Sequence, residues 1–347
     1  MKPLTKILIL LGLIGAIAGF LTYDAFNIAP KRYATRHETL SDEKIPQQLN
    51  DINILFFSDL EYGTFMNQER LDSLVNTINN ISPDVIIFGG DLYDQEAIAN
   101  ADTNAILSQA FGSMKAPLGK YAVYGDNDRT SSNRAEAFAK IMMEADFEIL
   151  NNNSITLRNK GSQSIYLTGL DNSLNGTTDT GTAYHNVSPE AYNITICHTP
   201  DTALEISSNL TDYFLAGHSH GGQAYFFFTA EYTPAYATDY LRGKHTIEDA
   251  FTLDITNGVG TTQKDVRFLS DPEVVVYHLQ SLAAEETPQS GLQTEPAPPA
   301  DEDVQIAPES TEVTEESMPE NTEEEVTEEE VPQEEKEEEP QEESGDE

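Results

Sequence analysis

The 347-residue sequence has little cysteine, little positive charge and no internal repeat of fixed period. Its single cysteine, Cys197, excludes an intrachain disulfide framework and a cysteine-rich zinc module. Lysine and arginine number 19 against 60 acidic residues, a formal net charge of −41, so the chain lacks the basic footprint of a nucleic-acid-binding protein. Stability must come from an apolar core, which a chain of this length can bury.

The acidic residues are concentrated near the C-terminus. Residues 284–347 contain 26 of the 60 acids, one lysine, eight prolines and no aromatic residue. This composition cannot bury enough apolar surface to offset chain entropy, so it predicts a disordered acidic tail. A solubilising or spacing role is favoured over an arm that binds cations or a partner.

Residues 1–28 have the pattern of a secretory signal or a signal anchor, in which two lysines precede an apolar run over residues 7–21. The run is long enough for a short membrane span. We favour an uncleaved, single-pass anchor in the cell membrane over cleavage after Ala18. The basic residues on either side of the span balance, so the preference for an extracytoplasmic catalytic domain does not follow from charge.

Residues 29–50 are polar without a sustained period and predict a juxtamembrane connector. Residues 51–283 alternate strand-like and helical patterns, which predicts one layered α/β (α+β) domain. The expected helices include residues 71–78 and 138–145, each with one apolar face. The expected strands are residues 52–58, 84–88, 121–124, 164–168, 194–197, 213–216 and 273–278.

Five polar clusters follow predicted strands. An aspartate after a strand usually forms a turn or caps a helix, so one such cluster is weak evidence for a functional site. Five of them in order, rich in carboxylates, imidazoles and glycines, favour a site for one or two divalent metals. Their candidate functional residues are Asp59, Glu61, Asp91, Asp94, Asp126, Asn127, His198, His218 and His220.

Some of these residues have an alternative interpretation. His218 and His220 lie two apart at a strand end, where side chains point the same way, which favours metal ligands. His198 could be a core histidine beside Cys197, itself interpreted as a buried structural thiol. The aromatic run over residues 225–228 is interpreted as sandwich core in preference to the lining of an apolar substrate pocket.

The ordered motifs resemble those of the calcineurin-like metallophosphoesterases, in particular the bacterial branch with an N-terminal anchor or export segment. That family's pattern is D-x-H, G-D-x-x-D, G-N-H-D/E, an isolated His and G-H-x-H. GDLYD at residues 90–94 and GHSHGGQ at residues 217–223 match it without change. The resemblance covers about residues 51–280 and implies a two-sheet β-sandwich flanked by helices, with the ligands on loops at one edge.

The resemblance also implies the roles of individual residues. A hydroxide that bridges two metals would attack phosphorus in line. Asp94 would orient a neighbouring side chain. Asp91 would bridge the metals, with Asp59 and His220 on the first and His198 and His218 on the second.

Three residues depart from the family pattern. Glu61 replaces a metal-binding His, Asp126 replaces a metal-binding Asn, and Asn127 replaces the His that protonates the leaving oxygen. Four carboxylates bring the charge of a two-metal site near zero and favour hard cations, manganese first, with magnesium, iron, calcium or zinc as alternatives. General acid catalysis contributes about a hundred- to ten-thousand-fold, and Asn127 cannot deliver a proton, which leaves Asp94 as a speculative substitute.

Two functions follow from these residues. The favoured one is an outward-facing, membrane-anchored phosphoesterase that acts on a phosphodiester or pyrophosphate of a small molecule or lipid. The alternative is a catalytically impaired relative that binds metal or a phosphorylated ligand as a surface adaptor, in which Glu61 and Asp126 are acidic loop residues. Because two of the three replacements are themselves potential ligands, we favour a working but altered site.

Overall fold

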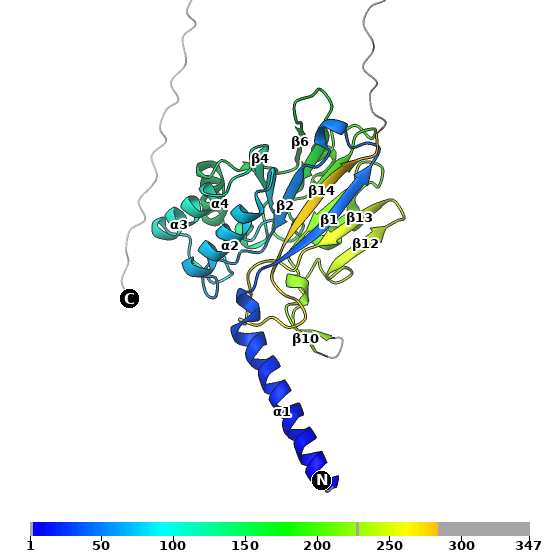
Figure 1. Cartoon of the computed structure of the whole chain (residues 1–347). Helices are drawn as coiled ribbons and strands as arrows, with labels where there is room; N and C mark the ends of the chain where they lie inside the picture. The colour runs from blue at the N-terminus through cyan, green and yellow to red at the C-terminus, as the bar shows by residue number, and fades with distance from the viewer. Residues whose placement is uncertain (1–2, 227–228, 284–347) are drawn as a thin grey trace, which may run out of the picture. The chain divides into compact units, whose positions relative to one another are not determined.

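The computed structural model describes residues 3–226 and 229–283. The chain begins with a long helix, α1 (Pro3–Asn27), and continues as a layered body of helices and two large sheets (Figure 1). This arrangement confirms the predicted fold class. The predicted acidic tail, residues 284–347, lies outside the described residues.

The elements of the body have the following bounds. The helices are α2 (Gln68–Ile81), α3 (Ala101–Gly112), α4 (Ser132–Glu144) and α5 (Thr180–Ala183), with 3₁₀ turns η1 (Ala29–Lys31), η2 (Gln47–Leu49), η3 (Asn127–Arg129), η4 (Pro200–Glu205) and η5 (His220–Gly222). The strands are β1 (Ala34–Asp42), β2 (Asn53–Phe57), β3 (Val85–Phe88), β4 (Gly119–Ala122), β5 (Glu148–Ile149), β6 (Asn153–Leu157), β7 (Ile165–Gly169), β8 (Asn193–Ile196), β9 (Tyr213–Ala216), β10 (Tyr225–Phe226), β11 (Thr229–Ala230), β12 (Gly243–Ile247), β13 (Phe251–Ile255) and β14 (Glu273–Ser281).

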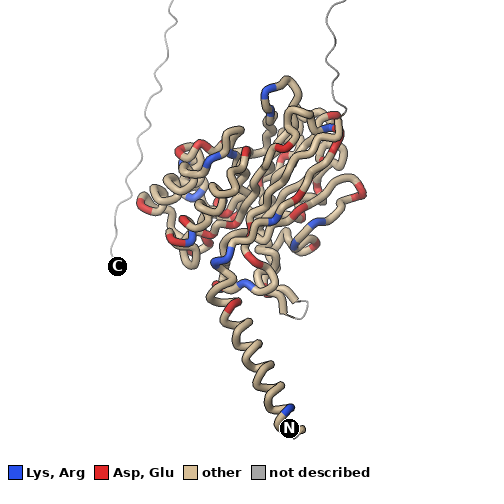
Figure 2. The backbone as a smooth tube through the Cα atoms, in the orientation of Figure 1, with Lys and Arg blue, Asp and Glu red and all other residues tan. Residues whose placement is uncertain are grey.

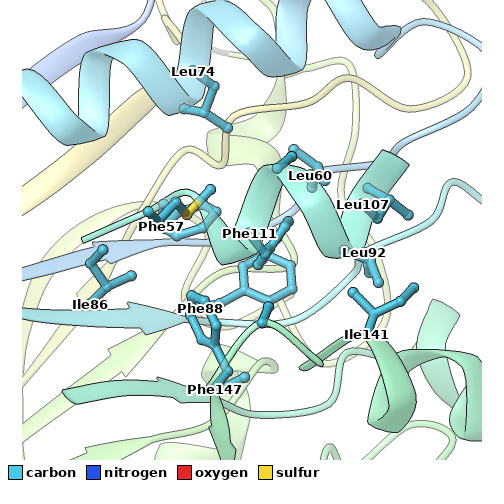
Figure 3. Packing of buried hydrophobic residues seen from close by; sticks show 14 of the residues in the cluster. Phe57, Leu60, Leu74, Ile86, Phe88, Leu92, Leu107, Phe111, Ile141 and Phe147 are labelled. Carbon is cyan, nitrogen blue, oxygen red and sulfur yellow. The ribbon is translucent and has the colours of Figure 1, made fainter. Parts of the chain in front are cut away.

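The first sheet has the strand order β1-β14-β2-β3-β4-β5, in which β2, β3 and β4 run parallel. Side chains alternate along β2, so Leu55 and Phe57 join the helix-side core while Ile54 and Phe56 join the core between the sheets. On the helix side, Phe57 packs against Phe111 of α3 with ring centroids 6.0 Å apart (Figure 3). Burial on both faces explains why β2 is a continuous apolar run.

The helices that cover the first sheet follow their apolar periodicity. In α2 the predicted face, including Leu71, Leu74 and Ile78, is buried. The side chain of Asn67 caps this helix by accepting the backbone N–H of Arg70 at 3.0 Å. Helix α4 also matches its prediction. Helix α3 was not predicted, because its apolar residues do not fall on one face.

The second sheet has the strand order β12-β13-β9-β8-β7-β6, in which β13, β9, β8 and β7 run parallel. Hydrogen bonds join the loops of one sheet to those of the other: the backbone N–H of His218 donates to Oδ1 of Asp59 at 2.9 Å, and Nδ1 of His198 lies 2.8 Å from the carbonyl of Gly89. The backbone N–H of Asn127, after β4, donates to Oδ1 of Asp91, after β3, at 2.9 Å. The loops after β2, β3, β4, β8 and β9 therefore converge at one edge of the sandwich.

Two predictions about residues outside the candidate site were wrong. Residues 29–50 are more than a connector, because β1 pairs in parallel with β14 from Ala34 opposite Glu273 onward. An edge strand with one exposed face can be polar throughout, so hydropathy did not reveal it. Phe226 in the aromatic run is 51% exposed and lies on the short β10–β11 hairpin, outside the sandwich core.

Candidate metal centre

Four of the predicted ligands form one compact group. Asp91 follows β3, Asp126 follows β4, His198 follows β8 and His218 follows β9. One potential ligand atom from each lies within 4.8 Å of the others. Because these residues come from loops of both sheets, the convergence of the parallel strands assembles the group.

The individual distances suit a shared cation. Nε2 of His198 lies 3.3 Å from Oδ2 of Asp91 and 3.2 Å from Oδ1 of Asp126, and Nδ1 of His218 lies 2.9 Å from Oδ1 of Asp126. Nitrogen and oxygen ligands that each lie roughly 2.0–2.2 Å from one metal are separated by comparable distances. The group is therefore a candidate position for one cation.

A second group adjoins the first. Nε2 of His220 lies 3.7 Å from Oδ1 of Asp59 and 3.6 Å from Oε1 of Glu61. The same Asp59 oxygen lies 3.8 Å from Nε2 of His198, so the two groups are contiguous. Asp59, Glu61 and His220 are buried and offer a candidate position for a second cation.

Hydrogen bonds outside the ligand groups orient two of the imidazoles. Nδ1 of His198 lies 2.8 Å from the carbonyl of Gly89, and Nε2 of His218 lies 2.8 Å from the carbonyl of Ala235. A carbonyl only accepts, so each of these nitrogens carries the proton and the other ring nitrogen keeps a lone pair. Among the described residues, Nε2 of His198 and Oε2 of Glu61 are buried without a hydrogen-bond partner, which fits metal ligation.

Five of the candidate ligands have a strained backbone. A non-glycine residue with positive φ is uncommon and costs of order 1 kcal/mol or more. Such strain often marks functional sites. The predicted strand geometry of His218 and His220 was wrong, because β9 ends before them and a tight turn presents both rings. The positive φ values are 56° at Asp59, 54° at Glu61, 59° at Asp91, 68° at His218 and 50° at His220.

Glycines make room for the crowded carboxylates. A Cβ on Gly125 would lie 2.0 Å from Oδ1 of Asp91. A Cβ on Gly217 would lie 2.0 Å from Oγ of Ser58 and 2.6 Å from Oδ2 of Asp59. The space that glycine leaves at both positions is occupied by potential ligands.

Asn127 contacts two candidate ligands. Its backbone N–H donates to Oδ1 of Asp91 at 2.9 Å, and its side-chain amide donates to Oε1 of Glu61 at 3.1 Å. Asn127 and Glu61 both depart from the family pattern, and they pair with each other. The amide therefore positions a carboxylate, which an amide can do, rather than delivering a proton.

Asp94 has a different environment from the one expected of a substitute acid. One oxygen accepts the backbone N–H groups of Glu96 at 2.9 Å and Ala97 at 2.6 Å, and the other accepts that of Thr64. Both oxygens are thus acceptors that shape a loop. This geometry argues against Asp94 as a proton donor and gives it a role in holding the segment beside Glu61.

Two residues that support the site were not recognised from the sequence. Asp128 is buried and accepts the backbone N–H groups of Asp91 at 2.9 Å, Leu92 at 3.0 Å and Gly125 at 2.9 Å, so it ties two ligand loops together. Burial, and then the charge of Asp91, raise the pKa of Asp128 to about 7. The available signal was its place at the end of the third cluster, where the family pattern G-N-H-D/E also has an acidic residue.

The second unrecognised residue is Arg267, which is fully buried. Its guanidinium donates to the carbonyl of His220 at 2.8 Å and to that of Ser270 at 3.2 Å. Burial lowers the pKa of Arg267 to about 10. No motif surrounds it in the sequence, so only the three-dimensional structure reveals its contact with the ligand turn.

The electrostatics of the site favour bound cations. Burial and then Asp91 raise the pKa of Glu61, and burial and then Asp126 raise the pKa of Asp91. Burial opposes ionisation of Asp126 as well, but the adjacent imidazoles of His198 and His218 outweigh it and lower its pKa. Buried carboxylates that repel one another need positive partners, and divalent metals supply them.

The comparisons with known proteins agree with this geometry. Residues 52–222 match the family model described as calcineurin-like phosphoesterase. An uncharacterized metallophosphoesterase of Bacillus subtilis, YkuE, is 29% identical over 291 residues, which cover 81% of this chain and 99% of that protein. An uncharacterized metallophosphoesterase of Aquifex aeolicus is 27% identical over 245 residues, covering 69% of this chain and 88% of that protein.

Two further matches are a mammalian relative and a solved bacterial structure. A Bos taurus transmembrane protein with metallophosphoesterase domain is 25% identical over 252 residues, covering 69% of this chain and 55% of that protein. The crystal structure of the calcineurin-like phosphoesterase YfkN from Bacillus subtilis aligns with 15% identity and a TM-score of 0.35, covering 60% of this chain and 81% of that one.

Proposed function

The chain carries a calcineurin-like phosphoesterase domain, and from this premise we propose that it is a metal-dependent hydrolase of a phosphodiester or pyrophosphate. The observation that carries the proposal is the compact group of Asp91, Asp126, His198 and His218. Asp59, Glu61 and His220 would complete a two-metal site beside it. We propose manganese as the metal, because the added carboxylates suit a hard cation.

The chemistry requires one water. Its oxygen forms the new bond to phosphorus while the ester bond breaks, and the leaving oxygen keeps the electron pair and takes up a proton. Bound divalent cations supply Lewis-acid activation and neutralise phosphate charge. The chain's own residues hold this arrangement: Asp128 and Arg267 fix the ligand loops, and Asn127 aligns Glu61.

A second function competes with hydrolysis. The amide of Asn127 is engaged with Glu61, and both oxygens of Asp94 accept backbone N–H groups. In the part of the chain that the structure describes, neither Asn127 nor Asp94 is therefore placed to give a proton to the leaving group. These contacts favour, as the alternative, a surface adaptor that binds metal or a phosphorylated ligand without turnover.

To decide between a hydrolase and an adaptor, we would measure hydrolysis of bis(p-nitrophenyl) phosphate by the full chain in detergent with Mn²⁺. Asp91→Asn should abolish turnover, whereas the exposed Asp249→Asn should not, because Asp249 lies in the turn between β12 and β13. Turnover only in Asn127→His would favour the adaptor. Turnover that survives Asp91→Asn would contradict the proposed site.

We propose further that α1 anchors the protein and that the body faces outward. Among the described residues one helix is long and apolar enough to cross a membrane, and it lies at the N-terminus. The single cysteine, Cys197, is buried, so Asp249→Cys would provide one accessible thiol. A membrane-impermeant maleimide should label that variant in intact cells. Labelling only after lysis would show that the body faces the cytoplasm and would contradict the proposed orientation.

A further inference from the structure

Helix α1 joins the body beside the turn that carries His220. Ala25 packs with Ala224 and Val266 in a small buried cluster. The backbone N–H of Arg267 donates to the carbonyl of Ala25 at 2.9 Å. Figure 1 shows the labelled β10 strand close to the body end of α1. Any bilayer that α1 crosses must therefore end near the metal centre.

The charge pattern of α1 places this end of the body at the membrane surface. The sequence has no charged residue between Lys6 and Asp24, and Figure 2 shows α1 uncharged over most of its length. Arg32 pairs with Asp24 at 3.3 Å and with Asp271 of the body at 3.0 Å. The first charges after the apolar run thus link the helix to the body, and such charges lie at the level of the lipid headgroups.

Exposed apolar side chains surround the same junction. Phe26, Phe226 and Leu269 are 49%, 51% and 70% exposed. Phe226 stacks on Phe268 with ring centroids 5.5 Å apart. We name Phe26, Phe226, Phe268 and Leu269 the apolar shelf. A hollow of about 470 Å³, lined in part by Phe26 and Phe226, opens between the helix and the β10–β11 hairpin.

Positive charge borders the shelf. Arg242 lies over the ring of Tyr225, with its guanidinium carbon 3.9 Å from the centroid, and it donates to the carbonyl of Leu269 at 3.0 Å. Lys264 also lines the hollow, where it pairs with Glu231. Aromatic and aliphatic side chains next to basic ones are the composition of a surface that contacts headgroups and acyl chains.

The chain leads directly from the shelf to the metal centre. The N–H of Glu231 donates to the carbonyl of Ala224 at 2.8 Å, and that of Tyr232 to the carbonyl of Gly222 at 3.3 Å. The ring of Tyr232 packs edge-on against His220 with centroids 5.5 Å apart. The hairpin that contributes Phe226 to the shelf therefore ends on a candidate ligand.

We propose that the substrate is an amphiphile resident in the bilayer, a phosphate ester whose alkyl chain rests on the apolar shelf while its phosphate reaches the metal centre. This inference rests on the phosphoesterase function proposed above. A bilayer lipid is preferred to a second protein as the occupant, because α1 itself brings the membrane to this surface. The bond broken is the phosphoester bond, with water as the only co-reactant.

The position of the shelf can be tested without catalysis. The sequence contains no tryptophan, so one introduced indole reports on its own site. In full-length protein reconstituted in phosphatidylcholine–phosphatidylglycerol vesicles that contain acyl-chain-brominated lipid, Phe226→Trp fluorescence should be quenched. Met143→Trp, at a 71%-exposed position on α4, should not be quenched. Equal emission of Phe226→Trp with and without bromine would overturn the proposal.

The substrate class is tested with two esters that share a leaving group. Methyl p-nitrophenyl phosphate is soluble, whereas hexadecyl p-nitrophenyl phosphate inserts into the same vesicles. We expect the ratio of kcat/KM for hexadecyl over methyl ester to fall by about tenfold in Phe226→Ser/Leu269→Ser, through the lost apolar contact. Met143→Ser should keep the native ratio.

The quenching experiment and the ester comparison together distinguish the ways in which the proposal could fail. A ratio that is the same in the native protein and in the double variant would overturn the assignment of an amphiphilic substrate. Quenching of Phe226→Trp without hydrolysis of either ester would support the membrane contact. The same result would overturn the phosphoesterase function and therefore also the proposed substrate class. Quenching together with the tenfold fall would support the whole proposal.

Discussion

Arg267→Met tests whether a buried arginine holds the ligand turn in place. Its guanidinium donates to the carbonyl oxygens of His220 at 2.8 Å, Ser270 at 3.2 Å and Gly258 at 3.4 Å, and also to that of Gly260. It thereby connects the turn that carries a candidate ligand to two neighbouring loops. Methionine has a comparable length but offers no donor, so the variant removes these bonds with little change in volume.

The magnitude follows from two opposing contributions. Hydrogen bonds from a charged donor contribute roughly 1.5–3 kcal/mol each, so the four bonds, taken at the low end of this range, give about 6 kcal/mol. Burial lowers the pKa of Arg267 to about 10, and this corresponds to about 3 kcal/mol of unfavourable charge burial. Replacement removes both contributions, so we expect the free energy of unfolding to fall by about 3 kcal/mol.

Urea unfolding of the full chain in detergent with chelator, followed by circular dichroism, measures this loss. Arg158→Met is the matched control, because Arg158 is exposed and surface substitutions change stability by about 0.5 kcal/mol or less. The affinity for Mn²⁺ should fall about tenfold at the same time, as expected when the support of a ligand is removed. A loss no larger than that of the control would refute the argument.

Three further changes have defined outcomes. Gly217→Ala should abolish manganese binding by equilibrium dialysis, because the new Cβ would lie 2.6 Å from Oδ2 of Asp59; retained affinity would contradict the crowding argument. Asn127→His should raise turnover of an alkyl phosphodiester by about a hundredfold, the low end of what general acid catalysis contributes. Turnover of an aryl diester should rise much less, because its leaving group needs less help from an acid; equal gains for the two esters would contradict an acid role. Burial opposes ionisation of Glu38, but the ion pair with Lys244, and then the ion pair with Arg36 at 2.9 Å, lower its pKa below the usual 4.5. The contribution of Glu38 to stability is therefore present above pH 4.5 and is lost as the pH falls through the lowered value. Glu38→Gln should therefore unfold more easily at pH 7, a difference that disappears in acid; a pH-independent difference would refute the ion-pair account.

Much of the fold could be predicted because burial leaves a direct pattern in the sequence. Strands buried on both faces, such as β2 and β3, are short apolar runs, and α2 shows its buried face at helical spacing. Strand β1 was missed because its stability comes from backbone pairing with β14, which requires no apolar run. Phe226 was misassigned because an exposed aromatic residue and a buried one look alike in a sequence.

The candidate site likewise contains residues that the sequence could reveal and residues that only the structure reveals. His218, His220 and Asp91 could be proposed from motifs, since metal ligands need particular residue types at fixed spacing. Arg267 could not be proposed, because its partners are backbone carbonyls that any sequence supplies. The contact between Asn127 and Glu61 joins residues that are 66 positions apart and depends on the convergence of two loops.

The metal content of the full chain is the most direct test of the central claim. After reconstitution with Mn²⁺ and removal of free metal, elemental analysis should find two manganese ions per chain in the native protein and in Asp249→Asn. Asp91→Asn should bind at most one, because Asp91 is the proposed bridging ligand. A native protein without tightly bound metal, or an Asp91→Asn variant with the native content, would contradict a metal-dependent phosphoesterase built on these residues.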